Sequence, residues 1–390
     1  MKSSKNCGRL KTASPMHMAM MSRRWLPTYK PKRGRKVSEL WICVKKEKPN
    51  NVLHRTQTSC AAELGVLAAF PAGWATTGKG RGMKIEGLAM PPFNTTLMGV
   101  VKGALDYHKI EVDAPTVFGA SGHAFLINIH GQLCPSGPYC WRREAASPLL
   151  GNLGLEMNDL GFFSPGDTPQ DRAAVEKKLR DALDGGIPCS LINLENQLVA
   201  GYDDEGFLTL QPWAPRVDFP PARLTFGSWR EFGDTFHVNF YTLTTVKPAE
   251  HRKAVLDSLA YAVDLFANPR DHSLTDYGVG PDAYANWIKA APEFGGSHGN
   301  WWNGTVWSEC RQMASRYFAE IGRRYDGVAR AAAELTKAYA EIGAALGRLS
   351  DKDMDGAEKV TLLAETREKE AEAIRKVPAL AASIRSGTRG

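Results

Sequence analysis

The sequence lacks both a long apolar stretch and a secretion signal. No run of about 18 or more apolar residues, the length that a membrane-spanning helix needs, occurs in the 390 residues. Residues 1–25 are basic but contain no apolar segment of the kind found in signal peptides. These two absences predict a cytoplasmic protein with no membrane partner.

Cysteines are few and widely spaced. There are seven, and only Cys134 and Cys140 lie close together in the sequence. Their spacing fits no common zinc site. We therefore expect reduced thiols, no metal ligands and no cofactor.

The net charge of +7 is unevenly distributed. Residues 1–82 hold 17 Lys or Arg and 3 Asp or Glu, whereas residues 83–390 hold 32 and 39. The tract KPKRGRK at residues 30–36 would suit an arm that binds nucleic acid. Alternatively, residues 1–82 are a disordered or non-native leader, because the glycine- and lysine-rich run before Met83 would be encoded by purine-rich codons that resemble a ribosome-binding site. We favour the leader, so nucleic acid is an expected partner only if this segment is native.

From residue 83 onward, helices and strands are expected to alternate up to residue 247. Thr168-Pro169 is a typical helix start, and Gly185-Gly186 a typical stop. A helix is also expected after residues 94–96, and strands or buried segments at 116–118, 124–129, 190–199 and 237–246. Residues 248–390 have amphipathic helical patterns that suit a bundle. The sequence thus predicts an α+β domain at 83–247 and a helical domain at 248–390.

Four segments carry a resemblance to a known family. They are GLAMPPFNTTLMGVVKGALDY, VFGASGHAFLINIH, LCPSGPYCW and GNWWNGTVWSECRQMASRYFAEI, within residues 84–325. They resemble uncharacterised bacterial proteins related to the N-terminal domain of butirosin-biosynthesis protein H, and more remotely papain-like bacteriocin-processing peptidases. The resemblance implies a papain-like cysteine-proteinase-type domain. In the parent group a Cys at the start of the first helix attacks an acyl carbon, a His on a later strand activates it, and an Asp or Asn orients that His.

None of these three residue types stands at the corresponding positions. The helix start has Asn94, Thr95 and Thr96, the strand has Glu195 and Asn196, and the position after the second strand has Gln211. A threonine hydroxyl is a poor nucleophile unless a base lies beside it, so Thr95 and Thr96 are catalytic candidates but are favoured as helix caps. Asn94, Glu195, Asn196 and Gln211 are candidate binding residues.

A relocated catalytic pair is the alternative. His123 follows a glycine turn and is a candidate general base, although a histidine bonded to backbone in a packed turn is favoured. Cys140 lies next to Arg142 and Arg143, whose charge is expected to lower the thiol pKa. Cys134 is a second, similar candidate.

The segment GGSHGNWWNGT at residues 295–305 contains polar and aromatic residues among glycines. We interpret it as a loop in which His298, Asn300, Trp301 and Trp302 line a binding pocket. The alternative interpretation is an Asn303 helix cap with tryptophans that pack between domains.

Two functions therefore stay open. The first is a degenerate papain-like scaffold that lacks the Cys–His–Asp triad and binds a small molecule or peptide. The second is an acyltransferase or amidohydrolase with a relocated nucleophile and His123 as its base, for which an acyl carrier protein would be a partner. The alanine-rich helices expected at 327–348 and 354–384 have broad faces, which also suggests a homo-oligomer.

Overall fold

The computed structural model describes residues 82–387, and the predicted leader at residues 1–82 lies outside them except for its last residue. The described chain is a mixed α+β structure with 53% helix and 15% strand. Helix exceeds strand because the part that follows residue 250 is almost entirely helical. The predicted α+β class with a helical C-terminal region is confirmed at this level.

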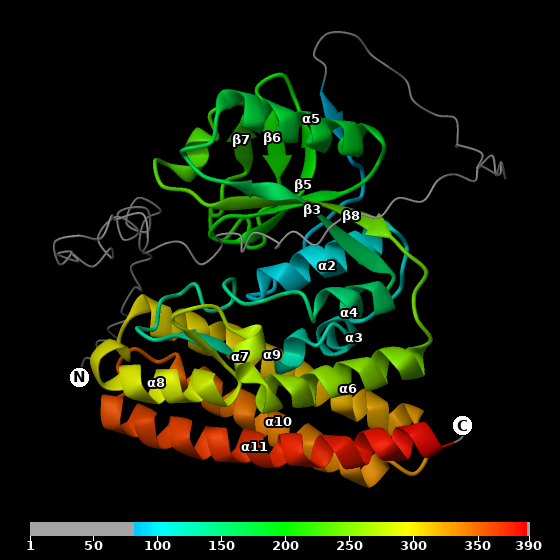
Figure 1. Cartoon of the computed structure of the whole chain (residues 1–390), viewed down its shortest axis with the longest axis vertical. Helices are drawn as coiled ribbons and strands as arrows, with labels where there is room; N and C mark the ends of the chain where they lie inside the picture. Colours follow the sequence, from blue (N-terminus) through cyan, green and yellow to red (C-terminus); the bar gives the residue numbers. More distant parts are fainter. Residues whose placement is uncertain (1–81, 388–390) are drawn as a thin grey trace, which may run out of the picture.

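A single antiparallel sheet forms the upper half of the molecule in Figure 1. Its path runs β3-β8-β4-β5-β6-β7, and β1 pairs with β5 beside this path. The strands are β1 (Met83–Lys84), β3 (Leu155–Phe163), β4 (Cys189–Ile192), β5 (Asn196–Tyr202), β6 (Gly206–Thr209), β7 (Arg223–Thr225) and β8 (Val238–Thr245).

Strand β5 has two partners along the same edge. Its first half pairs with β4, and its end pairs with β1. A side chain at Gly201 would place its Cβ only 2.1 Å from the carbonyl oxygen of Met83, so only glycine lets the two backbones approach this closely. The pairing register shifts beside Gly201, as it does where a strand bulges.

Two helices cover the opposite faces of the sheet (Figure 1). Helix α5 (Pro169–Asp184) lies on one face, and α2 (Thr96–Tyr107) packs on the other against β5. Helix α5 begins as the sequence predicts, because the Thr168 hydroxyl accepts from the backbone N–H of Asp171 and the Asp171 side chain accepts from the backbone of Thr168.

This capping box gives a first prediction. We expect Thr168→Ala to lower the free energy of unfolding by about 1 kcal/mol, because one N–H at the helix start then loses its acceptor. Thr168→Ser keeps the hydroxyl and should stay close to the native value. Urea unfolding followed by circular dichroism measures both variants, and equal losses would contradict the capping role.

The C-terminal helices form the lower half of the molecule, and the segment between α2 and β3 packs on them. The strands β2 (Asn128–His130) and β9 (Tyr277–Val279) pair antiparallel within this half. The remaining helices are α3 (Ala114–Ala120), η2 (His123–Phe125), α4 (Ser147–Asn152), η3 (Arg230–Phe232), α6 (His251–Ala267), α7 (Pro269–His272), α8 (Pro281–Phe294), α9 (His298–Arg324), α10 (Ala329–Leu349) and α11 (Gly356–Ser386).

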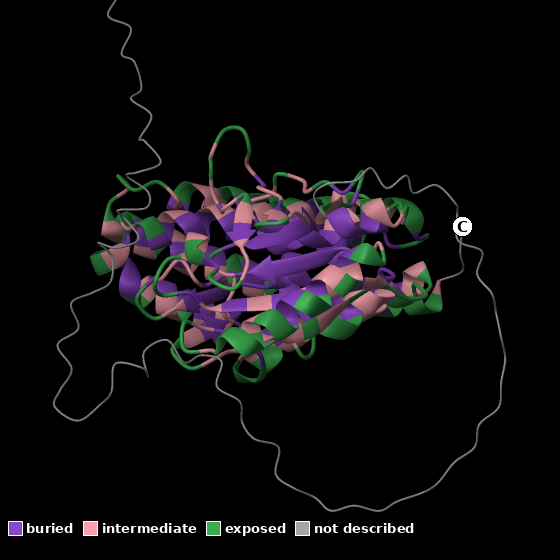
Figure 2. Cartoon of the chain, turned by 90° about the horizontal axis from the view of Figure 1, so that it is seen from above, coloured by how far each residue is buried: buried purple, intermediate pink, exposed green. Residues whose placement is uncertain are grey.

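Buried residues run continuously through the centre of the molecule (Figure 2). An ion pair lies within this core: Arg311 Nε is 2.7 Å from Glu370 Oε1, and both side chains are fully buried. Tyr284 donates to the same carboxylate, and Arg311 also donates to the carbonyl oxygens of Ala124 and Leu126. Helices α8, α9 and α11 and the turn at η2 therefore meet at one polar cluster.

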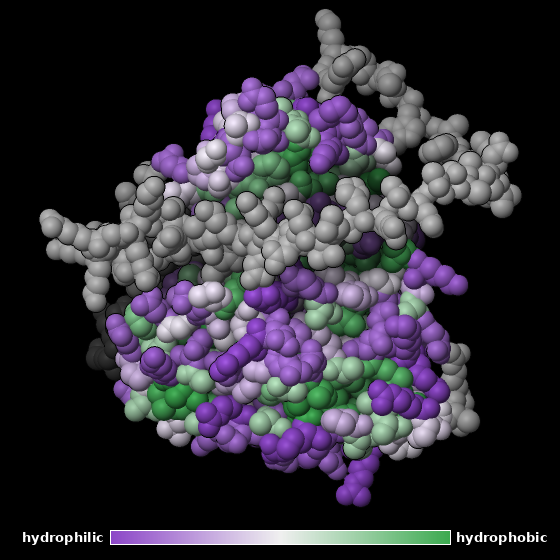
Figure 3. Space-filling model, in the orientation of Figure 1, coloured by the Kyte–Doolittle hydropathy of each residue, from purple (hydrophilic) through white to green (hydrophobic). Residues whose placement is uncertain are grey.

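The surface is mostly polar. Figure 3 shows hydrophobic areas on the helical half that are separated by hydrophilic residues. The large apolar side chains that remain exposed among the described residues are Phe162, Leu194 and Val246. No helix within residues 82–387 is both long and apolar enough to span a membrane.

Several local predictions were wrong. Residues 116–118 and 124–129 are mainly buried, which agrees with one of the two alternatives expected for them, but the strand alternative fails: 116–118 lies in helix α3, and 124–129 contains the turn η2 followed by the short β2. The stretch 190–199 is two strands, because residues 193–195 turn between β4 and β5. The expected loop at 295–305 is mainly the start of α9, whose cap is Ser297 and not Asn303. In each case long-range packing decides the structure, which a local pattern cannot show.

Candidate functional site

The start of helix α2 faces the turn between β4 and β5. The Thr96 hydroxyl donates to Glu195 Oε2 at 2.7 Å. It accepts from the Asn196 backbone N–H at 3.1 Å and from Asn196 Nδ2 at 3.2 Å. The structure thus brings together the helix start and the strand start that sequence reasoning had singled out. Neither threonine hydroxyl caps the helix, so the favoured interpretation of Thr95 and Thr96 as caps was wrong.

A tyrosine that sequence reasoning missed completes this group. Tyr139 Oη donates to Glu195 Oε1 at 2.5 Å, and Trp302 Nε1 donates to Tyr139 Oη at 2.8 Å. Five elements therefore supply one largely buried network: α2, the β4–β5 turn, β5, the loop before α4, and α9. Tyr139 stands beside Cys140 in the motif LCPSGPYCW, of which only the two cysteines were predicted as site residues. We call Thr96, Tyr139, Glu195, Asn196 and Trp302 the Thr96 cluster.

Burial controls the ionisation of the Thr96 cluster. Glu195 is 6% exposed, and desolvation raises its pKa from 4.5 to about 8, although the hydrogen bonds from Tyr139 and Thr96 act in the opposite direction. At neutral pH this carboxyl group is mainly protonated. Thr96 and Asn196 are likewise buried, with exposures of 1% and 3%. These three side chains are therefore closed off from solvent.

Gln211, which stands where the resembled enzymes have an Asp or Asn, does not join the Thr96 cluster. Its Nε2 donates to Asp218 Oδ1 at 2.9 Å and to the carbonyl oxygen of Pro220 at 2.8 Å. Gln211 therefore holds the loop that follows β6. No hydrogen bond within residues 82–387 joins it to Glu195 or Asn196.

His123 lies in the core and not at the cluster. Its ring packs between Trp141 and Trp307, with centroid separations of 5.8 and 6.3 Å. Burial, followed by the charges of Arg143 and Arg311, lowers its pKa to about 3. Across the described residues, no hydrogen bond joins its ring to Thr95, Thr96, Cys134 or Cys140, and its Nε2 has no partner.

The thiol at Cys140 was expected to have a lowered pKa. Burial instead raises the pKa of Cys140, because desolvation outweighs the charge of Arg143. Cys140 and Cys134 are both free and half-buried. Neither thiol is hydrogen-bonded to a histidine within the described part of the chain, so the arrangement that activates a cysteine nucleophile is not found there.

The residues predicted to line an aromatic pocket occupy the first turns of α9. Asn300 is fully buried, and its amide binds Trp287 Nε1 and the carbonyl oxygen of Leu349. Trp301 packs between His298 and the ammonium group of Lys352. Of the four predicted residues, only Trp302 reaches the Thr96 cluster.

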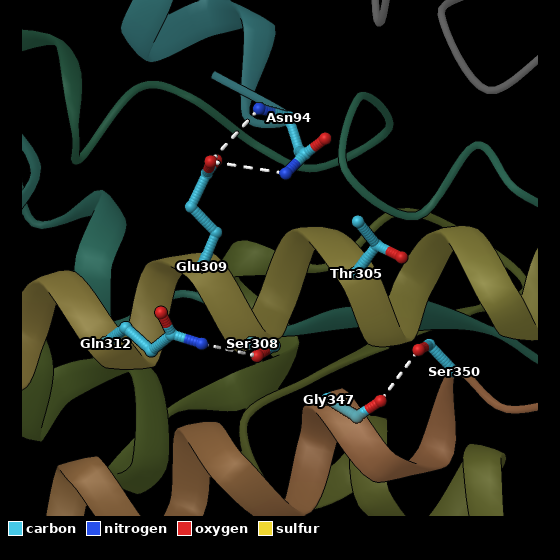
Figure 4. A pocket seen from close by; sticks show the side chains of 7 residues that line it. All are labelled: Asn94, Thr305, Ser308, Glu309, Gln312, Gly347 and Ser350. Carbon is cyan, nitrogen blue, oxygen red and sulfur yellow. Dashed lines mark hydrogen bonds between the residues drawn. The ribbon is translucent and has the colours of Figure 1, made fainter. Parts of the chain in front are cut away.

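A hollow of about 290 Å³ lies at the other side of the α2 start (Figure 4). Glu309, on α9, was also missed from the sequence. It accepts from the backbone N–H groups of Asn94 and Thr95 at 3.1 and 2.7 Å, and from Asn94 Nδ2 at 3.3 Å. Its carboxylate thereby caps α2, where the helix dipole favours negative charge. The lining residues are Asn94, Thr305, Ser308, Glu309, Gln312, Gly347 and Ser350.

No protein-family model matches the chain, and no match was found among curated proteins. Within residues 82–387, no group of three or more His, Cys, Asp or Glu side chains is placed to hold a metal ion. The Thr96 cluster and the hollow beside the α2 start are therefore the candidate functional features of the described residues.

Proposed function

We propose that the protein is a papain-like scaffold without a thiol–imidazole pair, and that it binds a small molecule or peptide in the hollow beside the α2 start. One observation carries this proposal. Thr96, at the place where the resembled enzymes have a cysteine, is hydrogen-bonded to Glu195 and Asn196, which stand where those enzymes have a histidine. Polar groups satisfy one another here and leave no activated nucleophile.

The protonation state of Glu195 supports a binding function over a catalytic one. Thr96 Oγ1 accepts from two Asn196 N–H groups, so its own proton has to point to Glu195. A carboxyl group with a pKa of about 8 is mainly protonated at neutral pH and is a poor acceptor for that proton. The hollow is more accessible to a ligand than the Thr96 cluster, because Asn94 and Glu309 are only partly buried and Gln312 is exposed.

The alternative acyl-transfer function needs His123 as a base. An imidazole with a pKa of about 3 has little affinity for a proton at neutral pH, and it lies between tryptophans in the core. Raised thiol pKa values at Cys140, Cys189 and Cys310 also disfavour a cysteine nucleophile. Binding is the function that this geometry supports best.

Alkylation of the thiols tests the proposal. We expect iodoacetamide at pH 7 to modify Cys140 no faster than it does in the guanidinium-unfolded chain, and Cys189 and Cys310 far more slowly, because burial raises both of their pKa values to about 12. Mass spectrometry of the digested protein gives the rate at each cysteine. His123→Ala should leave the rate at Cys140 unchanged. A cysteine that reacts faster in the folded chain, and slows in His123→Ala, would establish the enzyme instead.

A further inference from the structure

The hollow beside the α2 start has an unusual balance of hydrogen-bonding groups. Its three hydroxyl groups all donate their protons to backbone carbonyl oxygens: Thr305 to Trp301 at 2.8 Å, Ser308 to Gly343 at 2.8 Å and Ser350 to Gly347 at 2.6 Å. A hydroxyl has one proton and two lone pairs, so these oxygens are left as acceptors.

The amide of Gln312 adds to this balance. Its Nε2 donates to Ser308 Oγ at 3.1 Å, and in Figure 4 its oxygen points away from that bond, towards Glu309. Gln312 is exposed, whereas Ser308, which also lines the hollow, is buried. A ligand that enters past Gln312 thus meets oxygen acceptors on both α9 and α10.

Glu309 is the only charged residue that lines the hollow, and it has no cation. The donors to its carboxylate are two backbone N–H groups and one amide N–H, all of them neutral. Within residues 82–387 no Lys, Arg or His forms an ion pair with it. Burial raises the pKa of Glu309, as expected for a carboxylate without a countercharge. A cation that reached it would find both charge complementarity and free lone pairs.

We propose that the hollow binds an alkylammonium group, held by the Glu309 carboxylate and by the hydroxyl and amide oxygens of Thr305, Ser308 and Gln312. The three N–H protons of an ammonium match a site that offers acceptors and one negative charge. A volume of about 290 Å³ is at the lower limit of small-molecule sites, so it suits the end of a lysine side chain or a small amine better than a large ligand. This ligand class extends the proposed binding function and depends on it.

Titration of the full chain with two ammonium probes tests the proposal. The probes are 1-aminohexane, a free amine, and N-acetyl-lysine N-methylamide, which mimics a lysine within a peptide. N-acetyl-norleucine N-methylamide is the neutral control. We expect isothermal titration calorimetry to show binding of the ammonium probes, and at least about tenfold weaker binding of the neutral analogue. Tighter binding of the lysine mimic assigns a peptide ligand, and tighter binding of the free amine assigns a small molecule.

Substitutions locate the site. Glu309→Gln should weaken ammonium binding about tenfold or more. Glu365→Gln, which removes an exposed carboxylate on α11 that does not line the hollow, should leave the affinity unchanged. Equal affinity of the charged and neutral probes, or no effect of Glu309→Gln, would overturn the proposal.

Gln312→Lys provides a second variant that does not disturb the α2 cap. Residue 312 is one turn from Glu309 on α9, so the new ammonium group can reach the carboxylate from within the chain. We expect Gln312→Lys to have a higher melting temperature than the native chain and to lose probe binding. The double variant Glu309→Gln/Gln312→Lys should show no gain in melting temperature. An unchanged melting temperature together with unchanged probe binding would count against the site. Rapid cysteine alkylation, in contrast, would remove the non-catalytic function and leave these binding results as they are.

Discussion

Glu195→Gln is expected to make the stability of this protein less dependent on pH. The pKa of Glu195 is raised from 4.5 to about 8 in the folded chain, so the folded state holds a proton that the unfolded state releases. The stabilisation is complete below about pH 4.5 and is lost as the pH rises through about 8. At about 1.4 kcal/mol for each pH unit, the native chain should lose on the order of 5 kcal/mol from this group between about pH 4.5 and pH 8.

Glutamine imitates the protonated carboxyl group, because it is neutral, its oxygen can accept from Thr96, and its N–H can donate to Tyr139 Oη once the tyrosine hydroxyl proton turns away. We therefore expect the variant to match the native chain near pH 5 and to be more stable at pH 8 to 9, as measured by urea unfolding at each pH. Thr96→Val removes one donor to the carboxylate and should move the native transition to a higher pH. Parallel curves for the native chain and Glu195→Gln would show that Glu195 does not hold its proton on folding.

Removing one partner of the buried ion pair should produce the largest loss of stability. We expect Glu370→Ala to lower the free energy of unfolding by about 3–5 kcal/mol, because the fully buried Arg311 guanidinium loses its only carboxylate among the described residues. Tyr284 would also lose the acceptor for its hydroxyl. Thermal unfolding and urea unfolding both measure this effect.

The double variant Arg311→Met/Glu370→Leu separates the charge from the packing. With both charges gone, no buried ion remains without a partner, so the double variant should be more stable than Glu370→Ala alone. Lys369, on the same helix, pairs with Glu341 at the surface, and Lys369→Ala should cost about 1 kcal/mol or less. A double variant as unstable as the single one would mean that the lost hydrogen bonds to Tyr284 and to the carbonyl oxygens of Ala124 and Leu126, and not the unpaired charge, cause the damage.

The sequence predicted the elements that carry a local signal. Thr168-Pro169 and Gly185 bound helix α5 as expected, and the amphipathic helices after residue 250 are present. Strand β8 was also predicted within one residue at each end. The turn at residues 193–195 was missed because it contains neither glycine nor proline, the residues that most often mark a turn.

The candidate site was predictable only in part. The resemblance to papain-like enzymes led to Thr96, Glu195 and Asn196, which the structure joins by hydrogen bonds. Tyr139 contacts Glu195, which is 56 positions away in the sequence, and Glu309 contacts Asn94, which is 215 positions away. Nothing in the local sequence shows such contacts. Burial is likewise a property of the folded chain, and it reverses the expected direction of the Cys140 pKa shift.

The pairing of β2 with β9 joins two segments that are synthesised about 150 residues apart. Residues 128–130 have no strand partner until residues 277–279 have been synthesised. A nascent chain that has completed the sheet therefore still carries an open backbone edge next to apolar side chains such as Ile127 and Ile129. Within residues 82–387, folding during translation is consequently completed only when the segment around 277–279 has been made and closes the structure around 128–130.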